Sequence, residues 1–177
     1  MNTDIYKNTV PLFSVMLENL YQILEKAEKY STEKMTADKK PSEDFLLNYR
    51  LFPDMFPFIM QVQIACDNAK GATARLAGID IPKFEDNEKT FAELKTRVQK
   101  TKEFVDNIKE EQFAKADTRK IELPYVPGKH LLGDEYIKRY AVPNFLFHLA
   151  TAYNILRHNG LEIGKGDYIG KLNWIEN

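Results

Sequence analysis

The residues with the clearest potential for chemistry lie in one apolar segment near the end of the chain, between residues 141 and 160. Asn144 and His148 are four residues apart in a stretch that predicts a helix, so both fall on one helical face together with Thr151. Pairs of metal ligands on helices often have this spacing, but asparagine is a hard oxygen donor and a poor zinc ligand. The alternative is a core histidine that a polar neighbour satisfies, and we favour this interpretation.

The helix that carries these residues is expected to be central. Segment 141–160 is apolar on nearly every side, which is typical of a helix buried against more than one neighbour. Arg157 and His158 precede Gly160, a combination that predicts the end of the helix. His158 lies ~15 Å of helical rise beyond His148, so the two histidines cannot bind one metal from a straight helix.

A second helix is predicted from residue 57 to residue 77, with Gly78 as its C-cap. Its many alanines would allow neighbouring helices to approach closely, so we place it centrally as well. Its polar residues fall on two stripes, Gln61–Asn68–Arg75 and Gln63–Asp67–Lys70. One stripe is expected to be solvated and the other is available to face the last helix, although we favour the simpler interpretation that both flank the buried face.

The remaining elements follow from apolar periodicity and from turn residues. A first helix is predicted over residues 3–30, where Pro11 either opens the main helix or kinks a longer one. A long polar connection over 79–89 separates the second helix from a third, which a capping box starts at residue 90 and which runs to about residue 116. Segment 120–132 then reads as a short hairpin or paired extended segments.

Composition restricts the class of protein. The 177 residues predict a single domain over 1–177, and a formal net charge of −1 argues against nucleic-acid binding. A single cysteine, Cys66, excludes an intramolecular disulfide and fits a reducing cytoplasm. Asp4 and Lys7 stand where a signal peptide would be apolar, so a cytoplasmic location is expected. The charge-free run 140–156 is shorter than the ~20 apolar residues of a membrane span, so no membrane association is expected.

Three segments resemble a known family. They are the stretch from Gln61 to Gly71, the stretch from Pro143 to Tyr153, and the sequence Ile155-Leu-Arg-His-Asn-Gly. They resemble the DinB/YfiT-like superfamily of metal-dependent enzymes, and more closely a branch known only as a domain of unknown function. The resemblance implies an all-α four-helix bundle with an up-down-down-up course, with the extended insertion before the last helix. It also implies a homodimer.

The resemblance further implies a position for a metal site. Metal-binding members use one histidine from the second helix and a His-x-x-x-His pair on the last helix. Here His148 matches the second member of the pair, Asn144 matches the first, and the ligand on the second helix falls near Gln63 or Asp67. The ligand set is therefore incomplete, so no cofactor is expected, with a divalent zinc or nickel ion at His148 as the alternative.

These observations lead to two hypotheses of function, and they leave open whether the protein is an enzyme. In the first, a non-metal protein binds a small-molecule ligand or forms a homodimer, with a candidate pocket made of Gln63, Asp67, Asn144, His148 and Thr151. In the second, a metal-assisted hydrolase or thiol-dependent transferase uses His148 with Asn144 and Asp67. The stripe Gln63–Asp67–Lys70 discriminates between them, because an inward direction favours a site.

Overall fold

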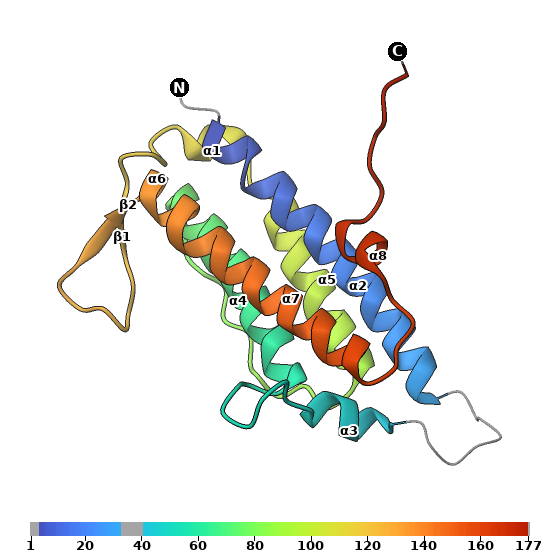
Figure 1. The fold of residues 1–177 in the computed structure, drawn as a ribbon. Coiled ribbons are helices and arrows are strands. Elements are labelled where there is room, and N and C mark those ends of the chain that lie inside the picture. The colour runs from blue at the N-terminus through green and yellow to red at the C-terminus, as the bar shows by residue number, and fades with distance from the viewer. Residues whose placement is uncertain (1–3, 33–40, 177) are drawn as a thin grey trace.

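The computed structural model describes residues 4–32 and 41–176 and is mainly helical (Figure 1). In chain order its elements are α1 (Asp4–Lys7), α2 (Val10–Thr32), α3 (Glu43–Asn48), α4 (Phe58–Ala77), α5 (Phe91–Asp106), η1 (Glu110–Phe113), β1 (Lys120–Glu122), β2 (His130–Leu132), α6 (Gly133–Tyr136), η2 (Ile137–Ala141), α7 (Val142–His158) and α8 (Lys165–Ile169). The predicted helical fold with a short hairpin before the last long helix is confirmed.

Four long helices enclose one hydrophobic cluster. Helix α5 packs along both α2 and α4, and α4 packs along α7 on its other side. In Figure 1, α2 and α7 run from the upper left to the lower right, whereas α4 and α5 run the opposite way. Because α4 and α5 run in the same direction, the connection 79–89 must return along their length. No helix in the two described ranges is long and apolar enough to cross a membrane.

The first predicted helix is divided into two. Helix α1 ends at Lys7, and α2 begins at Val10 with Pro11 in its first turn, where the missing N–H of proline costs no hydrogen bond. Thr9 separates the two helices. Its buried hydroxyl donates to the carbonyl oxygen of Ile5, and its carbonyl accepts from the amide of Phe13 at 2.9 Å. Pro11 therefore opens the main helix.

Helix α4 lies where its composition predicted. Ala65, Ala69 and Ala72 are fully buried, and their small side chains let α5 and α7 approach from two sides. The helix ends at Gly78, whose φ of +73° is a left-handed conformation that glycine adopts without the steric cost of a Cβ atom. The C-cap predicted at this glycine is confirmed.

Helix α5 is shorter than expected. Its capping box is present, with the amide of Glu93 donating to Oγ1 of Thr90 at 3.2 Å. The helix ends at Asp106, however, and a short 3₁₀ turn replaces its predicted last ten residues. The cause is a gap in the apolar pattern, because the buried residues Ile108 and Phe113 are five positions apart and cannot share one helical face.

The predicted hairpin leads into an irregular start of the last long helix. Strands β1 and β2 pair antiparallel, with Ile121 opposite Leu131. The element η2 is a π-helical turn, in which the amide of Val142 bonds to the carbonyl of Ile137. Pro143 lies in the first turn of α7, where a proline is tolerated. The irregularity therefore falls in η2, one turn before the proline.

Candidate functional site

A buried hydrogen bond joins α7 to α4 at the histidine that the sequence indicated. Nδ1 of His148 lies 2.7 Å from Oε1 of Gln61, which stands in the first turn of α4. Only 7% of His148 and 1% of Gln61 are exposed. Polar groups at this depth are costly unless they are hydrogen bonded, so the pair satisfies both residues at once.

The hydrogen bonds of Gln61 determine which nitrogen of His148 carries the proton. Nε2 of Gln61 donates to the carbonyl oxygen of Phe56 at 3.0 Å, and a carbonyl oxygen can only accept. Oε1 therefore faces the imidazole and accepts a proton from Nδ1. This tautomer leaves Nε2 of His148 with a lone pair that can accept a hydrogen bond or a proton.

Burial determines the charge of this histidine. It lowers the pKa of His148 below the ordinary value of 6.5, because the imidazolium would lose its hydration in the helix interface. The side chain is therefore neutral at pH 7, with a proton on Nδ1 and none on Nε2. A neutral imidazole in a fixed orientation is suited to accept a hydrogen bond from a ligand.

We expect Gln61→Glu to raise the pKa of His148 above that in the unsubstituted protein, because a carboxylate would then face Nδ1 and favour the imidazolium. Long-range ¹H–¹⁵N spectra recorded during a pH titration measure this pKa and identify the Nδ1–H tautomer in the unsubstituted protein. The resonances of His158, exposed at the end of the same helix, provide an internal control. An identical titration of His148 in both proteins would contradict the assigned geometry.

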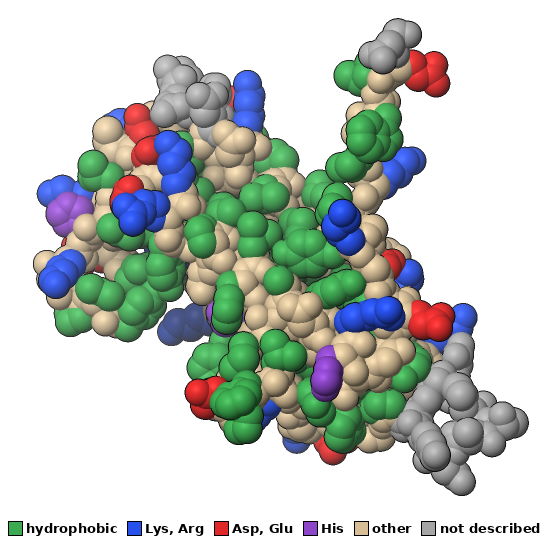
Figure 2. All heavy atoms as spheres, viewed as in Figure 1, with side chains coloured by type: hydrophobic (Ala, Val, Ile, Leu, Met, Phe, Trp, Pro, Cys, Tyr) green, Lys and Arg blue, Asp and Glu red, His purple; other side chains and the backbone are tan. Residues whose placement is uncertain are grey.

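Two half-exposed phenylalanines adjoin the pair, one through its ring and the other through its backbone carbonyl, and we call them the phenylalanine rim. Phe147 meets the imidazole edge-on, with ring centroids 5.3 Å apart, and is 54% exposed. Phe56, whose carbonyl orients Gln61, is 49% exposed. Figure 2 shows hydrophobic side chains gathered over the α3–α4 loop, which contains Phe56. The polar pair is thus bordered by the exposed ring of Phe147.

The two other α7 residues of the predicted pocket are less engaged with His148. Asn144 is half-buried one turn before it, and in the described ranges its side chain makes no hydrogen bond to the imidazole. Thr151 is buried, and its hydroxyl donates to the carbonyl of Phe147 at 2.7 Å. Asn144 is therefore available to a ligand, whereas the hydroxyl proton of Thr151 is used within its own helix.

The donors around His148 do not fit a catalytic zinc site. Such a site has three protein ligands, usually from histidine, cysteine or carboxylate side chains. In residues 4–32 and 41–176, no three side chains of these types converge. The group that faces His148 from α4 is a neutral amide, and it occupies Nδ1. A metal ion at Nε2 of His148 would therefore find only weak, neutral ligands beside it.

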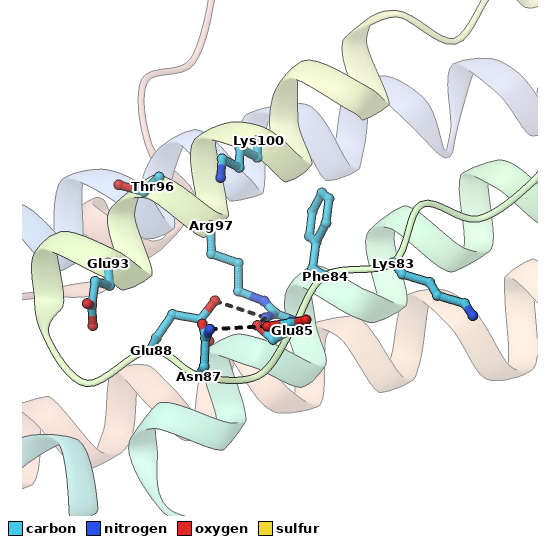
Figure 3. A pocket seen from close by; sticks show the side chains of 9 residues that line it. All are labelled: Lys83, Phe84, Glu85, Asn87, Glu88, Glu93, Thr96, Arg97 and Lys100. Carbon is cyan, nitrogen blue, oxygen red and sulfur yellow. Dashed lines mark hydrogen bonds and ion pairs between the residues drawn. The ribbon is translucent and has the colours of Figure 1, made fainter.

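A second polar cluster lies on the opposite side of α4, between α5 and the connection 79–89 (Figure 3). Its centre is Arg97 of α5, which is only 3% exposed. The guanidinium nitrogens lie 2.8 Å from a carboxylate oxygen of Asp86, 2.9 Å from Asp67 and 3.0 Å from Glu88. We call these four residues the Arg97 cluster. Its planar fork of donors holds three carboxylates that come from α4 and from the connection.

Further contacts complete the Arg97 cluster. Nζ of Lys70 lies 2.9 Å from Asp67 and 4.0 Å from the centre of the Phe84 ring. Nε2 of Gln63 donates to Glu88 at 2.9 Å. Burial by itself would raise the pKa of Glu88, but the hydrogen bonds from Gln63 and Arg97 outweigh it and hold this pKa below the ordinary value. The connection 79–89 is thereby tied to α4 and α5 by charge.

A cavity of about 390 Å³ opens beside this cluster. Charged and polar side chains form most of its wall, and Figure 3 shows them between α5 and the connection. The lining residues are Lys83, Phe84, Glu85, Asn87, Glu88, Glu93, Thr96, Arg97 and Lys100. Because its acidic and basic residues are interspersed, the wall has no clear preference for a ligand of one sign.

The structure divides the five predicted pocket residues between two places. Asn144, His148 and Thr151 lie on α7, whereas Gln63 and Asp67 belong to the surroundings of Arg97. The stripe that faces α7 is the one that contains Gln61. The expectation that one stripe would be solvated is wrong, because Gln63 and Lys70 are 7% and 4% exposed under the connection 79–89.

Sequence reasoning missed Gln61 and Arg97 as the principal partners. The sequence did contain an indication for Gln61, since this residue begins the polar stripe that repeats every seven residues. Arg97 also had one, because it is the only arginine in a helix otherwise supplied with lysines, and it stands next to the inward residue Val98. An arginine at such a position favours a buried, multiply bonded cation.

The lone cysteine does not add a nucleophile. Cys66 is fully buried in α4, and burial raises the pKa of its thiol to about 12 despite the neighbouring Arg97 charge. The thiol is therefore protonated at pH 7, and thiolate is the form that reacts.

Comparison with known proteins agrees with the resemblance seen in the sequence. Residues 5–169 match the family described as domain of unknown function DUF1993. The crystal structure of a DinB family member protein from Shewanella denitrificans is similar to this chain, with 44% sequence identity and a TM-score of 0.88. The match covers 99% of this chain and 95% of that chain. No curated protein matches. The family match extends over most of the chain, and the chain therefore belongs to the DUF1993 family, within the DinB-like proteins.

Proposed function

We propose that this protein binds a small polar molecule at His148 and requires no bound metal to do so. The observation that carries the proposal is the fixed neutral tautomer of His148, whose Nε2 lone pair is left unoccupied by the Gln61 contact. Nearby Asn144 can offer an amide to the same ligand. The site would then hold its ligand by hydrogen bonds. The incomplete set of metal ligands around His148 also favours hydrogen bonding over metal coordination.

The surroundings indicate the chemistry of this ligand. It should donate one hydrogen bond to Nε2, from a hydroxyl, thiol or amine N–H, because the unprotonated nitrogen of a neutral imidazole only accepts. It should also carry an apolar part, because Phe56 and Phe147 stand half-exposed beside the pair and gain from being covered. Phenol combines both features in a minimal probe.

We expect phenol to bind with a dissociation constant in the millimolar range, about 4 kcal/mol, which is reasonable for a ligand of seven heavy atoms. Binding should shift the Nε2 resonance of His148 in ¹H–¹⁵N spectra, whereas His148→Gln should weaken binding by about tenfold through loss of the fixed acceptor. His158→Gln is the matched control, because it removes an exposed histidine from the same helix and should leave binding unchanged.

Two results would contradict this proposal. One is a phenol affinity that is the same in His148→Gln and in the unsubstituted protein. The other is about one zinc or nickel ion per chain, measured by mass spectrometry after incubation with metal and lost in His148→Gln. The second result would favour the metal-dependent alternative instead.

The alternative is an enzyme of the hydrolase or thiol-transferase type, and one observation favours its acid–base form. Nε2 of His148 is unprotonated and oriented, as a general base must be. Asp67 cannot assist, because it is bonded to Arg97 and Lys70, so the chemistry would rest on His148 and Asn144. A bell-shaped pH–rate profile with any test ester or thiol would distinguish catalysis from binding.

We further propose a homodimer, an up-down-down-up course for the four long helices, and a cytoplasmic location. The exposed rim residue Phe147 supports the dimer, since a second chain could cover it as well as a ligand does. The opposed directions of α4 and α7 in Figure 1 support the course. The single buried thiol of Cys66 supports a reducing compartment.

A further inference from the structure

The far end of the α4–α7 interface holds a cation among tyrosines. Arg75 stands in the last turn of α4, roughly 21 Å of helical rise from Gln61, and its charge acts on Tyr136 to lower the pKa of that hydroxyl. The rings of Tyr136 and Tyr140 stack with centroids 5.7 Å apart. Tyr125, from the hairpin loop, bonds through its hydroxyl to that of Tyr140. These four residues form the Arg75 cluster.

The Arg75 side chain is held flat against its own helix by a gap in the side-chain layer. A Cβ atom added at Gly71 would lie only 2.5 Å from Nη1 of Arg75, so the guanidinium occupies the space that a larger residue would fill. The guanidinium is therefore positioned one turn back along α4 and does not extend freely into solvent.

Arg75 differs from Arg97 in the charges that surround it. In residues 4–32 and 41–176 no carboxylate lies within 4.0 Å of it, whereas Arg97 on the other side of α4 has three such partners. The C-terminal end of α4 has a different cation, because the guanidinium of Arg119 lies against Gly78. A half-buried arginine without an anion retains most of its donors for a ligand.

The tyrosines add neutral donors and aromatic surface. Burial raises the pKa of Tyr136 despite the nearby Arg75, and burial together with the Tyr140 hydrogen bond raises that of Tyr125. Their hydroxyls thus keep their protons. Tyr125 is 61% exposed and makes the cluster accessible from solvent. One guanidinium, phenolic donors and aromatic faces together resemble a receptor for a planar oxyanion.

We propose that the Arg75 cluster binds the carboxylate of a small aromatic acid, at a site separate from His148. The carboxylate would pair with the guanidinium of Arg75 and accept a hydrogen bond from Tyr125, while the aromatic ring packs against Tyr125 and Tyr140. The π-helical turn η2, which contains Tyr140, packs against α4. Such turns are frequent at functional sites.

The test uses the full chain with three probes: benzoate, acetate and inorganic phosphate. Calorimetry should give millimolar binding of benzoate, with acetate and phosphate weaker by about threefold or more because they lack the ring. Arg75→Gln should weaken benzoate binding at least about tenfold, Arg75→Lys by less, and Tyr125→Phe by a few-fold. The Nε–Hε resonance of Arg75, which is assigned by its absence from the spectrum of Arg75→Lys, should shift when benzoate is added to the unsubstituted protein.

Arg139→Gln is the matched control, since it removes the same charge from an exposed position on η2 that pairs with Glu135. It should leave benzoate binding unchanged. Equal weakening in Arg139→Gln and Arg75→Gln would overturn the proposal, because it would show attraction by net charge alone. Benzoate binding that survives in a folded Arg75→Gln protein would overturn it too, as would no binding by the unsubstituted chain.

Discussion

Replacing Arg97 with methionine is expected to lower the free energy of unfolding by about 3–5 kcal/mol, because it leaves buried carboxylates without a counter-charge. Glu88 is the most affected, since only 9% of its side chain is exposed and its nearest cation is Arg97. Urea denaturation followed by circular dichroism measures the loss. Arg97→Lys should be less damaging, but it cannot reproduce the contacts of a planar fork with three carboxylates.

A double variant distinguishes loss of pairing from loss of packing. Arg97→Met combined with Glu88→Gln removes the cation and one of the orphaned charges together, so it should recover part of the stability lost in Arg97→Met. If the double variant is no more stable than Arg97→Met alone, then unpaired charge is not the cause. A loss below about 1 kcal/mol in Arg97→Met would mean that the Arg97 cluster contributes no more than an exposed ion pair.

The same pair predicts a pH dependence. The pKa of Glu88 in the folded chain is below its ordinary value of 4.5, so the unfolded chain takes up this proton first as the pH falls. The stabilisation is therefore complete above pH 4.5 and is lost as the pH falls through the folded-state pKa. Arg97→Met should remove this contribution, and its stability should depend less on pH in the acidic range.

Truncating Phe145 to alanine should cost about 3–5 kcal/mol of unfolding free energy, the range for a large aromatic side chain removed from a core. Phe145 is fully buried in α7 and meets Phe13 of α2 with ring centroids 4.7 Å apart. Its loss would leave a cavity between α2 and α7, where the two rings now meet. Thermal or urea unfolding of Phe145→Ala measures the effect.

Phe147, two residues along the same helix, provides the matched comparison. It is 54% exposed, so Phe147→Ala should change the unfolding free energy by less than about 1 kcal/mol. Phe147→Ala should instead weaken phenol binding, and it should weaken the proposed homodimer, which light scattering measures. Equal destabilisation by both truncations would contradict the assignment of Phe147 to an exposed rim.

The sequence was sufficient for the helices because their apolar residues repeat at helical spacing. Thr90 and Gly78 fixed two helix ends, since their capping chemistry is local and independent of tertiary packing. The end of α5 was misplaced because the apolar residues beyond Asp106 continue to be buried, although not in helical form. Burial alone does not distinguish a helix from a 3₁₀ turn.

The partner of His148 depended on information that periodicity does not contain. Gln61 and Gln63 are two residues apart on α4, so they point in nearly opposite directions, and only the packing of α4 against α7 selects between them. The fate of Asp67 depended on the connection 79–89, whose course over α4 brings Asp86 and Glu88 to Arg97. A polar segment without periodicity gives no indication of the surface that it will cover.

The extra residue of the π-helical turn η2 has a consequence for how this chain can change through evolution or engineering. One residue inserted into a helix rotates everything before it by ~100° relative to everything after it. The turn η2 lies between Tyr136 and His148 in the chain, so it sets the angle about the helix axis between these two side chains. Deleting one residue from 137–141 would turn Tyr136 away from Arg75 and leave the facing of His148 and Gln61 intact. The two ends of the interface can thus diverge independently.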